Sequence, residues 1–159
     1  MVTINKISAE FDDDSFKLIA IHCGLEGYAM AYHINNFVSL KLSRRVENKK
    51  KDEDEHDVLD TFLTYEYSDE INDQYWILIE NTIKEEKTNQ ALGLFSNEIA
   101  VNTYHLIEEW KEVDYFLKIE VEEDFLINDV VKKINMIPKV VTAYSIEVSA
   151  LKSKRNLIF

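Results

Sequence analysis

The residues of this chain that could do chemistry are few, and His22 with Cys23 is the first pair to consider. An imidazole beside a thiol can hold the thiol as the reactive thiolate. These two residues are adjacent in a predicted strand, where successive side chains point to opposite faces. We therefore interpret Cys23 as a small buried apolar residue and His22 as a structural histidine. The position of His22 beside Gly24, at a strand end, would also suit a histidine that lines a cleft.

Two acidic runs could hold a divalent cation: residues 12–14, Asp-Asp-Asp, and residues 52–56, Asp-Glu-Asp-Glu-His. A calcium loop needs alternating acidic residues, a Gly and a distant Glu, and neither run has that pattern. Zinc sites need Cys or His pairs at short spacing, whereas this chain has one Cys and four scattered His. We interpret both runs as solvated segments and expect no metal ion.

Other common catalytic patterns are missing as well. Phosphate-binding loops need clustered glycines, and the three glycines of this chain form no such loop. There is no Gly-x-Ser-x-Gly nucleophile elbow. We expect no cofactor, and the pattern favours a protein that is not an enzyme. An enzyme whose unrecognised site pairs His22 with carboxylates is the third alternative.

The composition narrows the classes of partner. The net charge of −12 repels phosphate backbones, so we expect no nucleic-acid binding. No apolar run approaches the roughly 20 residues that span a bilayer, and no signal peptide is evident, so we expect no membrane segment. A single Cys cannot form an internal disulfide, which favours a cytoplasmic protein.

The charge is unevenly distributed. Residues 130–159 carry six Lys or Arg and one Glu, a net charge of +5, in an otherwise acidic chain. This pattern is typical of a surface that balances its own charge. The alternative is a basic C-terminal segment that docks on an acidic face, its own or a partner's.

Residues 107–115 read Ile-Glu-Glu-Trp-Lys-Glu-Val-Asp-Tyr. This segment resembles the signature of the bacterial family IPExxxVDY. The matching residues are Ile107, Glu109, Val113, Asp114 and Tyr115, and Glu108 replaces the Pro. The first strand, residues 137–146 and the tail 151–159 also resemble the family, so the resemblance covers roughly residues 16–159. It implies a fold but no activity, because the family has none assigned.

The aromatic content is high for this length, and many of these residues lie on or beside predicted strands. They predict either a sheet core or an exposed aromatic patch that binds a partner. Asp114 stands at a strand start, where it can cap the preceding turn through backbone N–H groups. The candidate interaction or motif residues are Glu109, Trp110, Asp114, Tyr115, Pro138, Tyr144, Arg155 and Phe159.

The first half of the chain predicts a strand, a helix and a hairpin. Residues 16–23 are apolar on both alternating sets, which indicates a strand inside a sheet. Residues 25–40 predict a helix with one buried stripe, followed by a short strand at 41–47. Residues 58–67 and 74–83 predict two strands joined by a turn at 68–73.

The second half is less regular at first. Residues 91–105 receive no assignment, and residues 103–112 include a short helical segment. Residues 114–121 alternate as a strand, and a helix follows with Ile127, Val130, Val131 and Ile134 on one face. The acidic run at 122–124 suits the start of that helix, Pro138 ends it, and residues 140–148 form the last strand.

These elements predict a single α+β domain over residues 1–159, with a flexible arm at 1–14, a charged loop at 48–56 and a C-terminal tail at 149–159. The sheet is mainly antiparallel with two main helices on one face. Its C-terminal strand–helix–strand unit is ferredoxin-like or ACT-like, and the hairpin is an addition.

We expect a non-enzymatic cytoplasmic module that self-associates, through a sheet edge or the C-terminal segment, or that docks a protein partner. The alternative is an ACT-like domain that senses a small molecule near the turn at 137–138 or beside His22. The tail, which ends in Leu157-Ile158-Phe159, packs on its own domain or docks into a neighbouring subunit.

Overall fold

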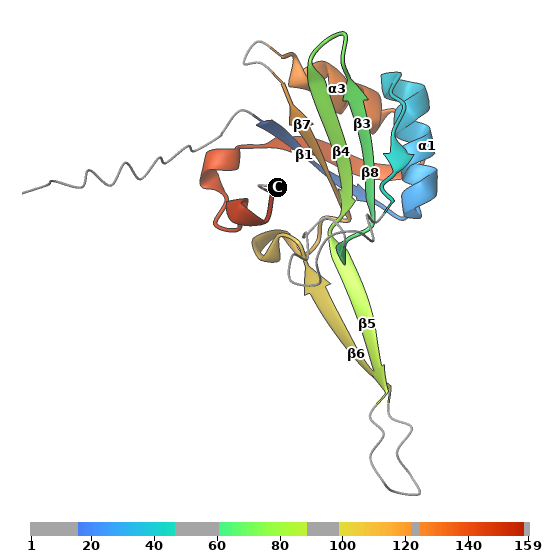
Figure 1. Ribbon diagram of the computed structural model, residues 1–159, viewed down its shortest axis with the longest axis vertical. Coiled ribbons are helices and arrows are strands. Elements are labelled where there is room, and N and C mark those ends of the chain that lie inside the picture. Colours follow the sequence, from blue (N-terminus) through green and yellow to red (C-terminus); the bar gives the residue numbers. More distant parts are fainter. Residues whose placement is uncertain (1–15, 47–60, 89–98, 122–124, 158–159) are drawn as a thin grey trace, which may run out of the picture.

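The computed structural model describes residues 16–46, 61–88, 99–121 and 125–157. Within these ranges lie a six-stranded sheet of order β2-β3-β4-β7-β1-β8 and a separate two-stranded ribbon, β5–β6. Every strand pair is antiparallel. Helices α1 and α3 cover one face of the sheet (Figure 1). The predicted α+β class, with a mainly antiparallel sheet and two helices, is confirmed.

The elements of the main body have the following bounds. The strands are β1 (Phe16–Cys23), β2 (Ser43–Arg44), β3 (Thr64–Asp69), β4 (Gln74–Glu80), β7 (Tyr115–Glu120) and β8 (Val140–Ile146). The helices are α1 (Gly27–Val38) and α3 (Ile127–Asn135), with short 3₁₀ helices η1 (Glu108–Trp110), η2 (Val148–Ala150) and η3 (Lys154–Leu157). The ribbon consists of β5 (Thr82–Thr88) and β6 (Ile99–His105).

Strand β1 lies inside the sheet, between β7 and β8, as the sequence predicts. Its side chains alternate between two apolar cores, because both faces of the sheet are covered. Ile19 and Ile21 face the helices, while Leu18 and Ala20 face the opposite side, and all four are fully buried. The helix stripe is confirmed, with Met30, Ala31 and Ile34 buried in the first core.

The second core is closed by the C-terminal segment. Val148, Leu151 and Leu157 are buried there against β1, β4 and β7. The tail therefore packs on its own domain as far as Leu157, and Phe159 lies outside the described residues. Burial of apolar surface on both faces of the sheet is the main stabilising term in this arrangement.

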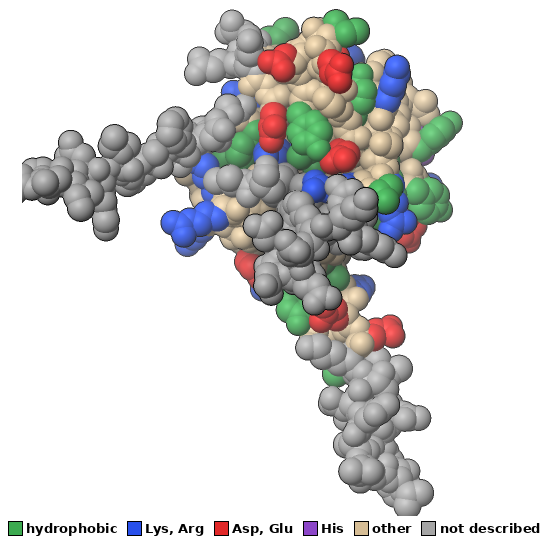
Figure 2. Space-filling model, in the orientation of Figure 1, with side chains coloured by type: hydrophobic (Ala, Val, Ile, Leu, Met, Phe, Trp, Pro, Cys, Tyr) green, Lys and Arg blue, Asp and Glu red, His purple; other side chains and the backbone are tan. Residues whose placement is uncertain are grey.

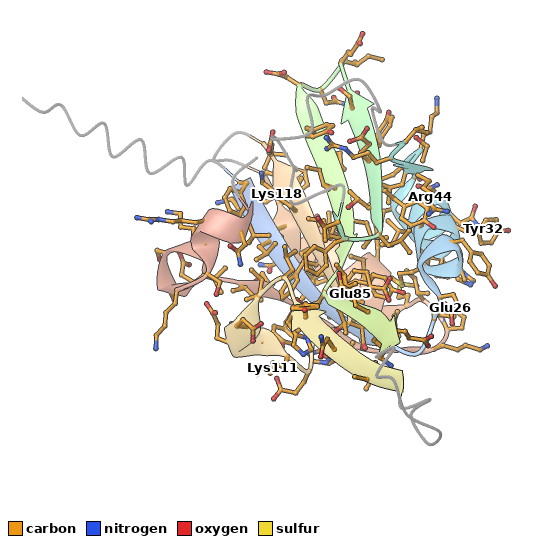
Figure 3. All side chains as sticks on the ribbon, turned by 60° about the horizontal axis from the view of Figure 1, so that its bottom comes forward. Glu26, Tyr32, Arg44, Glu85, Lys111 and Lys118 are labelled. Carbon is orange, nitrogen blue, oxygen red and sulfur yellow. The ribbon has the colours of Figure 1, made fainter. Side chains whose placement is uncertain are left out.

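Strand β7 is buried on both faces, and this includes a lysine. Lys118 is 3% exposed and lies in the body of the protein (Figure 3). Its Nζ is 2.7 Å from Glu120 Oε1 and 4.8 Å from the centre of the Phe16 ring. A buried ammonium needs such partners, because an isolated charge is costly to remove from water.

The predicted hairpin is β3–β4, and it belongs to the main sheet rather than being added to it. β3 begins at Thr64 and not at residue 58 as predicted. β4 ends at Glu80, so it offers no strand partner to the residues before Leu63. Residues 58–60 lie outside the described residues. The turn between the strands is shorter than predicted. Asp69 accepts hydrogen bonds from the N–H groups of Ile71 and Asn72 and so closes it.

The prediction of one strand over residues 74–83 is wrong. The chain leaves the main sheet at Asn81, and Thr82 starts β5, which pairs with β6 in the ribbon. Residues 99–105 therefore form a strand in a segment that the sequence left unassigned. The ribbon escapes a pattern search because apolar and polar residues do not alternate regularly along either of its strands.

Helix α3 begins at Ile127 and follows an N-cap residue, Leu126, that makes no side-chain capping bond. The predicted acidic cap is therefore wrong for the helix start, and residues 122–124 lie outside the described residues. The predicted arm at 1–14 and charged loop at 48–56 lie outside them too. In the described residues, no helix has the length and apolar character that crossing a membrane requires.

The packing of α3 on the sheet predicts the effect of truncating its core residue. Ile134 is fully buried, so Ile134→Ala should lower the free energy of unfolding by about 2–5 kcal/mol. Met136 is 70% exposed two residues later, and Met136→Ala should change it by less than about 0.5 kcal/mol. Urea unfolding of both variants measures the difference, and equal losses would contradict this packing.

Candidate functional site at the base of the β-ribbon

The ribbon begins at Asn81, whose side chain is fully buried where β4 leaves the sheet. Its Oδ1 accepts a hydrogen bond from the N–H of Ile107 at 3.0 Å. Its Nδ2 donates to the carbonyls of Trp110 and Val113, both at 2.9 Å. One buried amide thus satisfies three backbone groups of a segment that belongs to no strand.

The backbone of Asn81 holds the same segment. Its N–H donates to the carbonyl of Asp114 at 2.9 Å, and its carbonyl accepts from the N–H of Leu106 at 2.9 Å. Leu106 directly follows β6, so both strands of the ribbon are fastened at one residue. We call Asn81 and the backbone of residues 106–114 that it bonds the Asn81 clamp.

Glu109, in the segment 107–115, binds the C-terminal tail. Its Oε1 accepts hydrogen bonds from the N–H groups of Lys152 and Ser153, at 2.7 and 2.9 Å, and its Oε2 accepts from the Ser153 hydroxyl. Asn156 adds a bond from its Nδ2 to the carbonyl of Leu106. These contacts lock the tail against the clamp and give Glu109 a structural task.

Asp114 and Tyr115 bind the start of the fold instead. Asp114 Oδ2 accepts from the N–H of Cys23 at 2.9 Å, next to an irregularity in the β1–β8 register. Its partner is therefore the end of β1 and not the preceding turn that the sequence suggested. The Tyr115 hydroxyl donates to the carbonyl of Leu25 at 2.7 Å, just before α1.

Three of the aromatic side chains gather beside the clamp. The Trp110 and Tyr144 ring centres are 6.0 Å apart, and the His22 ring stacks on Tyr144 at 5.6 Å. His22 Nε2 and the Tyr144 hydroxyl form a hydrogen bond of 3.0 Å. Each ring is half-buried, so only part of each ring faces solvent, and the three rings do not form a fully exposed aromatic patch.

The remaining predicted residues do not share a described contact with this group. Pro138 is exposed in the turn between α3 and β8, Arg155 is exposed in η3, and Phe159 lies outside the described residues. The sequence thus pointed to residues of the segment 107–115, but their described contacts are structural ones. It missed Asn81, because a single Asn within a segment of strand-forming residues carries no recognisable pattern.

The chemistry available near the clamp is limited. Burial raises the pKa of the Cys23 thiol, and Asp114 adds to the effect, so Cys23 is held as the unreactive thiol. Burial also raises the pKa of Glu80, with further contributions from Glu26 and Asp114. Across the described ranges, no three or more His, Cys, Asp or Glu side chains are arranged to hold a metal ion.

No protein-family model, curated protein or solved structure matches this chain.

The Asn81 clamp predicts a large loss of stability when the amide is removed. Asn81→Ala leaves the buried Ile107 N–H and Val113 carbonyl without partners at about 1–3 kcal/mol each, whereas the Trp110 carbonyl still accepts from the Val113 N–H, so the loss should be about 2–5 kcal/mol. Asn128 is exposed, and Asn128→Ala should have little effect. Urea unfolding compares the two, and a loss for Asn81→Ala as small as that of the control would refute the clamp.

The raised pKa of Glu80 predicts a pH-dependent effect. The folded state binds this proton more tightly than the unfolded state, so Glu80 reduces stability as pH rises from the ordinary Glu range through the raised value. Glu80→Gln should therefore be more stable than wild type at pH 7, and the difference should shrink toward pH 4. Glu70 is exposed, so Glu70→Gln should show no such trend. Urea unfolding across that pH range tests the direction.

Proposed function

We propose that this protein is a non-enzymatic assembly module whose two copies associate through the β5–β6 ribbon. The observation that carries the proposal is the position of the ribbon, which projects from the body instead of joining the main sheet (Figure 1). An isolated two-stranded ribbon is marginally stable in water. A ribbon that is held at its base and stands clear of its own core is suited to gain its stability from another chain.

The faces of the ribbon favour pairing through its edges. Directly opposed residues share a face, so Ile83 with Tyr104 and Lys84 with Thr103 lie on opposite sides. Both sides mix apolar and polar side chains, and Val101 and Tyr104 are 52% and 44% exposed. Neither face is a continuous apolar surface on which a partner could pack. Backbone hydrogen bonding along the unpaired edge of one of the two strands is therefore the stronger interaction that the ribbon can make.

The charges of β5 favour a second copy as the partner. The strand carries Lys84 beside Glu85 and Glu86, and all three are exposed (Figure 3 shows Glu85). Antiparallel pairing of two β5 strands about a two-fold axis can place Lys84 opposite the partner subunit's Glu86, and symmetry repeats the pair. These two attractive pairs lie on one face, against a single pair of Glu85 residues at the axis on the other face. Opposite charges across strands stabilise pairing, and the resulting four strands exceed the two that are marginal alone.

The surface around the ribbon agrees with an interface of mixed charge. On the face shown in Figure 2, acidic, basic and hydrophobic side chains all lie near the start of the ribbon. A strongly acidic or strongly basic partner would meet like charge somewhere along such a strand. A second copy meets complementary charge in the register given above.

The finer fold assignment is part of the same proposal. Strands β7 and β8 both pair antiparallel with β1, which lies between them, and helix α3 connects the two. This arrangement supports a ferredoxin-like or ACT-like C-terminal unit, a kind of fold that hosts many functions. Membership of the IPExxxVDY family and a cytoplasmic location stay predictions, as does the small-molecule sensor.

Charge reversal tests the proposed dimer. Lys84→Glu should weaken self-association, because two glutamates would face each other, and Glu86→Lys should weaken it by pairing two lysines. The double exchange of both residues should restore it. Sedimentation at matched concentrations distinguishes the four proteins, and a wild type that stays monomeric throughout would refute the proposal.

A second variant removes the ribbon without touching the clamp. Thr82 and His105 are directly opposed at its base, so an Asn-Gly turn can replace residues 83–104. This protein should unfold cooperatively like wild type and sediment as a monomer. Retention of the dimer would place the interface elsewhere.

A further inference from the structure

The main sheet ends in two edge strands, β2 and β8, and each presents backbone groups that another strand could bind. In an antiparallel pair, the N–H and C=O groups of alternate residues point toward and away from the partner strand. The outward groups at each edge therefore decide whether the sheet can be extended. At both edges, an asparagine from the preceding helix contacts such groups.

At the β8 edge, Asn135 forms hydrogen bonds with both backbone groups of Ala143. Its Oδ1 accepts from the Ala143 N–H at 2.8 Å, and its Nδ2 donates to the Ala143 carbonyl at 2.8 Å. The same Nδ2 also donates to the Val131 carbonyl within α3 at 2.9 Å, which fixes the amide in place. The side chain thus makes the two bonds that an added strand would make in the middle of β8.

At the other edge, Asn35 of α1 makes the same pair of bonds with Leu42. Its Oδ1 accepts from the Leu42 N–H at 2.7 Å, and its Nδ2 donates to the Leu42 carbonyl at 3.0 Å. Leu42 directly precedes β2. The N–H of Arg45 bonds the Thr64 carbonyl, so Arg45 and Ser43 face β3, while Leu42 faces outward.

We propose that Asn135 blocks strand addition at β8 and so prevents a second copy of this chain from extending the main sheet. The two edges differ in how much they need such a block. β2 has two residues and includes Arg44, and both features discourage pairing. β8 has seven residues, Val-Val-Thr-Ala-Tyr-Ser-Ile, with no charge and strong strand propensity.

The strand that Asn135 keeps away is the β8 strand of a second copy. β8 carries no charge, so two copies of it do not repel each other. Two β8 strands can pair antiparallel about a two-fold axis and would join two six-stranded sheets. Val141 is 80% exposed on this strand, so the described residues leave β8 largely uncovered there, and a second β8 strand can approach it.

Asn135→Ala tests the block. The variant should sediment as a larger species than wild type at equal concentration, and increasingly so as concentration rises. Asn35→Ala is the matched control: it removes the same two bonds at an edge of two residues, and it should sediment like wild type. Running each variant also with Lys84→Glu separates this association from that of the ribbon.

A lysine on the edge distinguishes strand addition from misfolding. Val141→Lys should return Asn135→Ala to the size of wild type, because a charged edge resists pairing, whereas it would not rescue an unfolded chain. Near-ultraviolet circular dichroism checks the fold of each protein. An Asn135→Ala protein that is folded and sediments like wild type, or one whose larger species persists with Val141→Lys, would overturn the proposal.

Discussion

The interaction on which the structure depends is the buried amide of Asn81. A polar group removed from water is costly unless it is hydrogen-bonded, and this one is fully satisfied by backbone groups of the clamp. Because it sits where β4 leaves the sheet, it determines both where the ribbon begins and how residues 106–114 run. That segment in turn carries Glu109, Asp114 and Tyr115 to the C-terminal tail, β1 and the start of α1.

The same chemistry recurs at the edges of the main sheet. A side-chain amide carries a donor and an acceptor, so an asparagine can replace the bonds of a neighbouring strand at one residue. Asn35 and Asn135 do this from helices that precede the edge strands, while Asn81 does it for a segment that no strand reaches. The ribbon carries no such amide among its described contacts, which is why it stands out as the element available for association.

The sequence predicts the repeated apolar patterns well and the exceptions poorly. The strand over Phe16–Cys23 is correct at both ends, and helices α1 and α3 lie within the predicted segments, because alternation and helical spacing reflect burial directly. The division of residues 74–83 at Asn81 was missed, since every residue on either side of it suits a strand. The partners of Glu109 and Asp114 were missed as well, because they lie 43 and 91 residues away.

The amino-acid sequence by itself determined the fold class, the interior position of the first strand and the faces that the helices bury, since these follow from side chains close together in the chain. Only the tertiary structure decided where the chain leaves the main sheet, which surfaces stay open and what Glu109, Asp114 and Tyr115 bind. Those outcomes depend on hydrogen bonds between backbone and side chains far apart in the chain, and such bonds leave no periodic trace in the order of residues.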